Sequence, residues 1–91
     1  MIYYTYILRS INYPDHIYIG YTTDLKERLL QHNSGSTFYT AKYKPWNMVI
    51  FFGFKEKIAA TKFEKYLKSH SGRAFISRHF LCDSSILNKS I

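Results

Sequence analysis

The chain has 91 residues, of which 46% are hydrophobic and 19% aromatic, which supports one small folded domain and excludes wholesale disorder. A formal net charge of +7 favours a polyanionic partner such as nucleic acid. The single cysteine, Cys82, excludes an intrachain disulfide and a thiolate zinc site. Because no signal-peptide pattern and no membrane-spanning apolar run are found, we expect a soluble cytoplasmic protein with no membrane partner.

The first elements along the chain predict an antiparallel hairpin. Residues 2 to 8 and residues 16 to 21 are rich in Tyr and Ile, as strands are. The turn between them is Asn12-Tyr13-Pro14-Asp15, in which proline fixes a backbone angle and Asn and Asp cap the bend. The two tyrosine motifs Tyr4-Thr5-Tyr6 and Tyr18-Ile19-Gly20 therefore fall on neighbouring strands.

A helix is predicted next, over residues 24 to 32. It begins with acidic residues at capping-box spacing, and a Ser-Gly pair shortly after its end supplies a stop. Leu25 and Leu29 repeat at helical spacing. At about 100° per residue, Arg28 and His32 fall beside this apolar stripe and not opposite it. Both polar side chains should therefore point toward the protein body or its edge.

The remaining residues predict a loop, a strand and two helices. Residues 33 to 46 mix Gly, Ser, Lys and Pro with aromatic residues, which indicates a loop with aromatic anchors. Residues 48 to 54 are almost continuously apolar and predict the most buried strand. A helix is expected over residues 55 to 70, a break at Ser71-Gly72, and a last short helix over residues 73 to 81.

This order of elements predicts the α+β class, with a small three-stranded antiparallel sheet flanked by helices. We expect a single domain over residues 1 to 82. Residues 83 to 91 are rich in Ser and Asn and predict a flexible C-terminal tail.

The motifs in this order resemble the GIY-YIG nuclease superfamily, and in particular its class of small stand-alone bacterial single-domain proteins. The resemblance covers about residues 2 to 80. It rests on Tyr4-Thr5-Tyr6, on Tyr18-Ile19-Gly20, on the helix with its following Gly, and on Tyr39-Thr40 with the later Pro45-Trp46. The first motif begins with Tyr4 where the family has Gly, a departure that is common in the small class.

The resemblance implies hydrolysis of a phosphodiester by direct attack of water, with one divalent metal ion, Mg²⁺ or Mn²⁺. It makes Tyr6 and Tyr18 the signature tyrosines, Arg28 the motif arginine, His32 the histidine one turn later, and Glu64 the metal ligand. A phenol can orient or deprotonate the water, a guanidinium can hold a phosphate, and imidazole can move a proton. Magnesium is often held by one or two carboxylates.

Each assignment has a structural alternative. The two tyrosines are equally suited to packing in a small core. Arg28 has the spacing to pair with Asp24, and His32 to face the negative end of the helix dipole. Glu64 has the spacing of an intrahelical ion pair with Lys68, which is worth a few tenths of a kcal/mol.

Cations interleaved with aromatic residues predict a rim that contacts a nucleic-acid backbone and stacks on bases. We assign to this rim the residues Tyr39, Lys42, Lys44, Arg73 and Arg78. The alternative is a solvated charged face.

We therefore predict a metal-dependent endonuclease for structured or damaged nucleic acid, with DNA favoured over RNA, a role in DNA repair, and a protein partner that supplies targeting. The first alternative is a nucleic-acid-binding module of the same fold with little or no catalysis. Many members of the superfamily use an asparagine after the glutamate helix, and residues 65 to 82 contain none, which favours this alternative. The second alternative is an interaction protein whose charge engages ribosomal RNA or an acidic protein.

Overall fold

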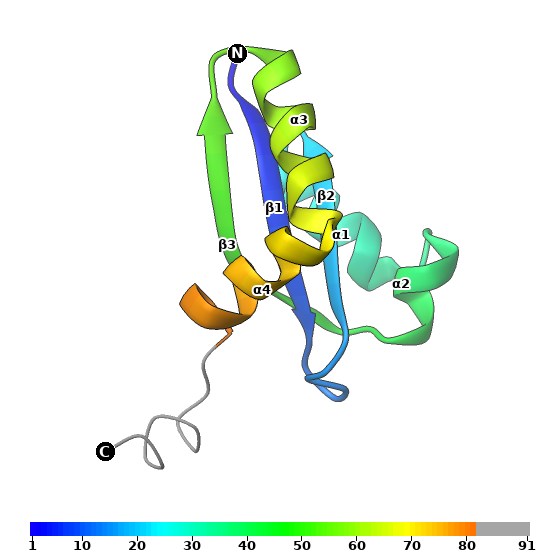
Figure 1. Cartoon of the computed structure of the whole chain (residues 1–91). Coiled ribbons are helices and arrows are strands. Elements are labelled where there is room, and N and C mark those ends of the chain that lie inside the picture. The colour runs from blue at the N-terminus through cyan, green and yellow to red at the C-terminus, as the bar shows by residue number, and fades with distance from the viewer. Residues whose placement is uncertain (82–91) are drawn as a thin grey trace.

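The computed structural model describes residues 1 to 81, and within them it shows three strands and four helices (Figure 1). In chain order they are β1 (Tyr3–Ser10), β2 (Ile17–Thr22), α1 (Leu25–Ser34), α2 (Phe38–Lys42), β3 (Trp46–Phe54), α3 (Lys57–Lys68) and α4 (His70–His79). None of the helices in this part of the chain is long and apolar enough to cross a membrane. Cys82 and the tail expected over residues 83 to 91 lie outside the described residues.

The three strands form one antiparallel sheet in the order β2-β1-β3, with β1 in the centre. The predicted α+β class with a three-stranded antiparallel sheet is confirmed. On one side Tyr6 of β1 pairs with Gly20, and Leu8 pairs with Tyr18. Because directly paired residues and residues two apart share one face of a sheet, these four residues lie on the same face.

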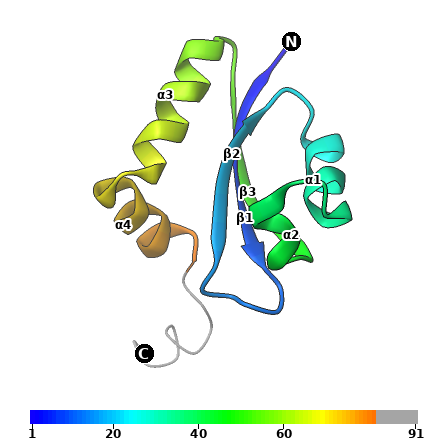
Figure 2. The ribbon, with the colours of Figure 1, turned by 90° about the vertical axis from the view of Figure 1, so that its right-hand side faces the viewer.

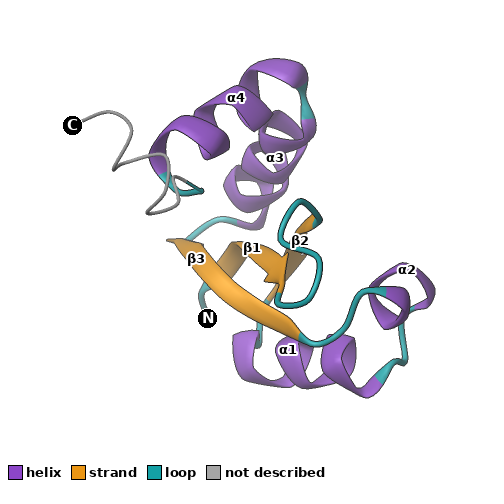
Figure 3. Cartoon of the chain, turned by 90° about the horizontal axis from the view of Figure 1, so that it is seen from below, coloured by secondary structure: helices purple, strands orange, loops and turns teal. Residues whose placement is uncertain are grey.

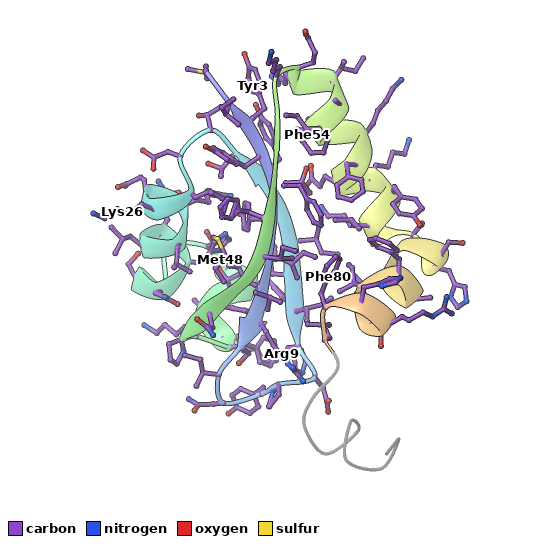
Figure 4. All side chains as sticks on the ribbon, turned by 90° about the vertical axis from the view of Figure 1, so that its left-hand side faces the viewer. Tyr3, Arg9, Lys26, Met48, Phe54 and Phe80 are labelled. Carbon is purple, nitrogen blue, oxygen red and sulfur yellow. The ribbon has the colours of Figure 1, made fainter. Side chains whose placement is uncertain are left out.

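Helices cover both faces of the sheet. Helices α1 and α2 lie on one face and α3 and α4 on the other, as Figures 2 and 3 show from two directions. The core is divided accordingly. The cluster on the α1 side is built on Tyr6, Leu8 and Trp46, and the cluster on the α3–α4 side on Ile7, Ile19, Leu67 and Ile76. Figure 4, which looks onto the β3 edge, shows Met48 on the first side, and Phe54 and Phe80 on the second.

Helix α1 has the ends that its sequence predicts. The Asp24 side chain accepts a hydrogen bond from the Glu27 backbone N–H at 3.1 Å, which satisfies one of the free donors of the first turn. Gly35 ends the helix with φ of 86°, a left-handed conformation that glycine adopts without strain. The helix extends two residues beyond the predicted end at His32, through Ser34.

The prediction that residues 48 to 54 form the most buried strand is wrong. Thr5, Tyr6, Ile7 and Leu8 of β1 are all fully buried, because β1 has a neighbour on each side and helices on both faces. Strand β3 is an edge strand, and its Phe51 is 51% exposed. The apolar run of β3 therefore indicates that both faces of this edge strand are partly buried, and it does not indicate a central place in the sheet.

Two features of the helices also differ from the prediction: one short helix was not predicted, and the break between the last two helices is shifted. The segment over residues 33 to 46 contains the short helix α2 and is not a continuous loop. The break between the last two helices falls at Ser69, whose side chain accepts a hydrogen bond from Gly72 N–H as the N-cap of α4. Gly72 lies inside α4, and a Cβ at this position would stand only 2.6 Å from Leu67 Cα. This glycine permits the close approach of two helices and does not stop one.

Candidate active site

The side chain of Tyr6 extends across the edge strand β2 at Gly20. The phenol is fully buried, and a Cβ built on Gly20 would stand 2.5 Å from Tyr6 Cζ, far inside van der Waals contact. Only glycine therefore leaves room for the Tyr6 ring at this position. The presence of glycine at the end of the second tyrosine motif, Gly20, is thus explained by the Tyr6 ring of the first motif, which passes over it.

The Tyr6 hydroxyl is hydrogen-bonded to two side chains of α1. It lies 2.8 Å from His32 Nε2 and accepts a hydrogen bond from Arg28 Nε at 3.3 Å. The ring of Tyr18 lies 6.3 Å from that of Tyr6 and 4.8 Å from that of His32, centroid to centroid. Four of the five predicted catalytic side chains are thus brought together, and the prediction that Arg28 and His32 point toward the protein body is confirmed.

His32 is held from its other side by α2. Its Nδ1 lies 2.8 Å from the hydroxyl of Thr40, and this hydroxyl also lies 3.4 Å from the Thr37 carbonyl oxygen. If the hydroxyl donates to that carbonyl, it accepts from Nδ1–H, and Nε2 is left to accept the Tyr6 proton. Trp46 fixes Thr40 in turn, since its Nε1–H donates to the Thr40 carbonyl oxygen at 2.7 Å.

The burial of this cluster keeps both Tyr6 and His32 neutral. Burial raises the pKa of Tyr6 to about 12, although the hydrogen bond and the charge of Arg28 oppose this shift. Burial and the positive charge of Arg28 lower the pKa of His32 to about 4. At neutral pH the proton therefore stays on the Tyr6 oxygen. Both side chains are fully buried, so in this structure they support neighbouring groups and do not face solvent.

Arg28 is the partly exposed cation of the cluster. Besides Tyr6, its guanidinium contacts Gln31, donating from Nη1 to Oε1 at 2.8 Å. The hydrogen bond to Tyr6 raises the pKa of Arg28 above its ordinary value. Asp24 is engaged in capping the helix, and the one ion pair among residues 1 to 81 does not include it. The alternative in which Arg28 pairs with Asp24 is therefore not what the structure shows.

Glu64 lies on α3, across the sheet from the other four residues. Its carboxylate accepts a hydrogen bond from Lys68 Nζ at 2.9 Å, and its side chain is 22% exposed. The ion pair considered from the helical spacing is thus present. The negative charge of Glu64 adds slightly to the burial that raises the pKa of Tyr6.

The oxygen and nitrogen donors of this region determine which divalent metal could bind here. Residues 1 to 81 contain no group of three or more His, Cys, Asp or Glu side chains able to hold a metal ion. A closed protein cage is thus not built in this part of the chain. One partly exposed carboxylate, Glu64, suits Mg²⁺, which commonly keeps several waters and takes its remaining oxygens from a substrate phosphate.

A cleft runs along the outside of β2, the strand that faces the viewer in Figure 2. Its volume is about 350 Å³, and it is lined by Ile17, Tyr18, Ile19, Tyr39, Lys68 and Arg73. Tyr39 and Arg73 of the predicted rim are thus placed beside Tyr18, although they come from opposite helical layers. Lys68, which the sequence did not assign to the rim, joins the cleft to Glu64 through its ion pair.

The other predicted rim residues lie elsewhere. Lys42 lines a second depression, on α2, and its Nζ lies 5.5 Å from the centre of the Tyr43 ring. Lys44 approaches Gly35, where a Cβ would stand 3.3 Å from its Nζ. Arg78 is exposed on α4 and does not line the cleft. The predicted rim of five residues is therefore split, with two at the cleft beside Tyr18, two around α2, and Arg78 at neither place.

Comparison with known proteins decides the family. The profile described as the GIY-YIG catalytic domain matches residues 2–77, which is most of the chain. The chain belongs to the GIY-YIG family. The fold and the tyrosine motifs on the paired strands agree with the resemblance found in the sequence.

Several proteins named SLX1 are similar in sequence. The chain is 43% identical over 77 residues to the protein of Malassezia globosa named structure-specific endonuclease subunit SLX1, covering 79% of this chain and 17% of that one. It is 41% identical to the SLX1 protein of Candida dubliniensis, covering 97% of this chain and 32% of that one. The chain thus spans less than a third of the length of these curated relatives.

A solved structure is similar over most of its length. The UPF0213 protein of Bacillus halodurans, determined by NMR in solution, is 31% identical, with a TM-score of 0.52. The match covers 86% of this chain and 84% of that one. Most of the described fold thus has a counterpart in a solved structure.

Two residues of this GIY-YIG site were missed by sequence reasoning. Thr40 belongs to the Tyr39-Thr40 pair that carries part of the family resemblance. Its contact with His32 was not predicted, because residues 33 to 46 were expected to form a loop. Lys68 was considered only as an ion-pair partner of Glu64. Its place in the cleft depends on how α3 packs against β2, which no local pattern indicates.

Proposed function

We propose that this domain is a metal-dependent endonuclease that hydrolyses phosphodiester bonds in branched or otherwise structured DNA. The observation that carries the proposal is the hydrogen bond that fixes the Arg28 guanidinium on Tyr6, whose ring lies 6.3 Å from that of Tyr18, centroid to centroid. Tyr18 in turn lines the cleft together with Lys68 and Arg73. The name of the SLX1 relatives, structure-specific endonuclease subunit, supports structured DNA as the substrate. That substrate class is consistent with the predicted role in DNA repair.

The proposed reaction is hydrolysis by direct attack of water on phosphorus. Lys68 and Arg73 hold the phosphate backbone in the cleft, and Arg28 contacts the non-bridging oxygens, where negative charge grows in the transition state. The Tyr18 hydroxyl orients the attacking water. As the new P–O bond forms, the attacking water gives up one proton to the solvent. The bond to the leaving oxygen breaks, and that oxygen takes up one proton from the solvent. Glu64 would hold a divalent metal ion such as Mg²⁺, which would supply positive charge to the phosphate in the transition state.

Tyr6, His32 and Thr40 act as positioning residues in this proposal. They form a buried chain of hydrogen bonds that ends on Arg28. A long arginine side chain loses rotational freedom when it binds a phosphate. A guanidinium that is already fixed by a buried phenol loses less on binding, so this chain should increase both affinity and rate.

The decisive experiment compares labelled nicked, branched, single-stranded and duplex DNA and RNA as substrates, in Mg²⁺, in Mn²⁺ and in EDTA. The test variant is Glu64→Gln, which keeps the shape of the side chain and removes its charge. The matched control is Glu56→Gln, since Glu56 is an exposed glutamate at the start of the same helix whose side chain makes no capping bond. We expect metal-dependent cutting of branched DNA by the wild type and by the control, and none by Glu64→Gln.

A binding module with little or no catalysis is the second candidate. The engagement of Glu64 by Lys68 favours it, as does the lack of asparagine in residues 65 to 82. Salt-sensitive binding without cutting on every substrate and with either metal would establish the binding module and exclude the nuclease.

Two finer assignments belong to the same proposal. The small single-domain class is supported by the UPF0213 protein, of which the chain covers 84%. A protein partner that supplies substrate targeting is supported by the word subunit in the name of the SLX1 relatives. Size-exclusion chromatography of the protein with bound DNA tests the first assignment, and a pull-down from the source cells tests the second.

A further inference from the structure

The outer side of α2 has a feature that the proposed reaction does not use. A depression of about 600 Å³ is lined by Gly35, Phe38, Tyr39, Ala41, Lys42 and Tyr43, and we call it the aromatic pocket. Phe38 at its rim is 96% exposed. An almost fully exposed phenylalanine contributes little to folding, since it buries hardly any apolar area.

The aromatic pocket neighbours the cleft beside Tyr18, and the two share one lining residue. Tyr39 lines both depressions. Its ring lies 6.2 Å from the ring of Tyr18 on one side and 5.4 Å from that of Tyr43 on the other, centroid to centroid. A strand that occupies the cleft beside Tyr18 therefore reaches the aromatic pocket by passing over one tyrosine.

The rim of the aromatic pocket is cationic. Lys42 lies over the ring of Tyr43, and Lys44 approaches Gly35. Neither lysine belongs to the one ion pair that the described residues contain. The lining holds no carboxylate. Flat apolar rings beside amines suit a nucleotide, whose base stacks on the rings and whose phosphate is attracted by the amines.

We propose that the aromatic pocket binds an unpaired nucleotide of the substrate, adjacent to the phosphate held beside Tyr18. This inference rests on the proposed nuclease function and narrows its substrate class to DNA that carries a single-stranded arm next to the cut. The base lies against Phe38 and Tyr39, and Lys42 attracts the phosphate. A paired base cannot take this place, because its faces are covered by the neighbouring base pairs of the duplex.

The test measures binding in the Glu64→Gln background, so that it does not depend on cleavage. Fluorescence anisotropy measures the affinity for two DNAs, one with a short single-stranded arm and one fully paired duplex of the same sequence. The proteins compared are the parent, which retains Phe38, and its Phe38→Ala and Phe38→Trp variants. We expect Phe38→Ala to weaken binding of the armed DNA by about 5- to 150-fold, the range for loss of one base–aromatic stack. Binding of the duplex should stay within about twofold, and Phe38→Trp should bind the armed DNA as tightly as the parent.

The matched control is Leu30→Ala, which removes another exposed apolar side chain, 59% exposed on α1 and outside the lining of the pocket. It should leave both affinities unchanged. A second readout places 2-aminopurine in the arm, whose fluorescence should fall on binding to the parent and not on binding to Phe38→Ala.

The outcomes separate this inference from the proposed function. Equal weakening of both DNAs by Phe38→Ala, no weakening of either, or no DNA binding by the parent would each overturn the unpaired-nucleotide site. Selective weakening together with no cleavage of any substrate by the wild type would establish the site and disprove the nuclease.

Discussion

Gly20 and Tyr6 face each other across neighbouring strands, and the phenol occupies the space that a side chain at Gly20 would need. The Tyr6 hydroxyl thereby reaches Arg28 and His32 on α1. The two motifs, which lie on the two strands of one hairpin, are therefore parts of one packing arrangement: the large side chain of one requires the glycine of the other.

Replacement of Gly20 by alanine should disturb the site at its base. The new methyl group overlaps the buried Tyr6 ring, which must move away from Arg28. We expect a loss of about 1 to 3 kcal/mol in the free energy of unfolding, the usual cost of overpacking. DNA cleavage should fall by at least about tenfold. Urea denaturation and a cleavage assay on the same preparation measure the two effects.

Gly53→Ala is the matched control for this prediction. Gly53 is also a strand glycine on that face of the sheet, paired with Tyr4. A Cβ there meets Ile2 Cγ2 at 3.1 Å, the end of a flexible and exposed side chain. This variant should keep cleavage. Equal activity in Gly20→Ala and Gly53→Ala would show that the path of Tyr6 does not set the activity.

Tyr6→Phe and Tyr18→Phe should separate stability from activity. The first leaves His32 Nε2 buried without its partner, which costs about 1 to 3 kcal/mol of unfolding free energy, and it also releases Arg28. The second removes a hydroxyl from the cleft and should lower the cleavage rate with little change in stability. Thermal unfolding and single-turnover cleavage distinguish them. A stability loss of the same size in both variants would contradict the distinct positions given to the two phenols.

Thr40 should act on the site through His32. Thr40→Val keeps the volume of the side chain and removes the hydroxyl that meets His32 Nδ1 at 2.8 Å. We expect a loss of about 1 to 3 kcal/mol for the unsatisfied buried nitrogen, and a lower kcat together with a higher KM because Arg28 is fixed less firmly. Thr40→Ser keeps the hydroxyl and should restore these quantities. The nitrogen chemical shifts of His32 measured by NMR should change in the valine variant and return in the serine variant.

The stability of the domain should depend on pH through His32. Its folded pKa of about 4 lies below the unfolded value of about 6.5. The unfolded chain therefore binds more protons between these two values, and stability is fully present above about pH 6.5 and is lost as the pH falls toward about 4. From about pH 7.5 to about pH 5 the loss should be about 2 kcal/mol.

His32→Gln is the control for this pH dependence. It lacks the titrating ring, while the carboxylates that titrate in the same range remain. Urea denaturation at several pH values should show a flatter profile for the variant over this range. Parallel profiles for the two proteins would mean that His32 is not held neutral by its surroundings.

The sequence predicted the hairpin and α1 because their signals are local. The turn residues, the capping aspartate and the glycine with positive φ each act within a few residues of where they stand. Helix α2 was missed for the opposite reason. Its N-cap residue Thr37 makes no side-chain capping bond, and the helix is held by Trp46 and by His32, which are not part of it.

The candidate site was predictable as far as helical spacing and motif order extend. The prediction that Arg28 and His32 lie on one flank of α1 was correct because it followed from helical spacing. The division of the rim was not predictable. Which lysines and arginines meet at the β2 edge depends on how α2 and α4 pack on opposite faces of the sheet, and residue type alone does not show this packing.

The division of the site between two layers has a consequence for how activity is lost. Arg28 and His32 belong to the layer on one face of the sheet, while Glu64 belongs to α3 on the other. Local unfolding that detaches only α3 and α4 would remove the carboxylate and leave the arginine cluster intact. The domain would then keep the phosphate contact of Arg28 and lose both the carboxylate and the two cations of the cleft, Lys68 and Arg73. Loosening one layer, with every site residue retained in the sequence, would thus be sufficient to abolish the proposed cleavage while the Arg28 cluster stays folded.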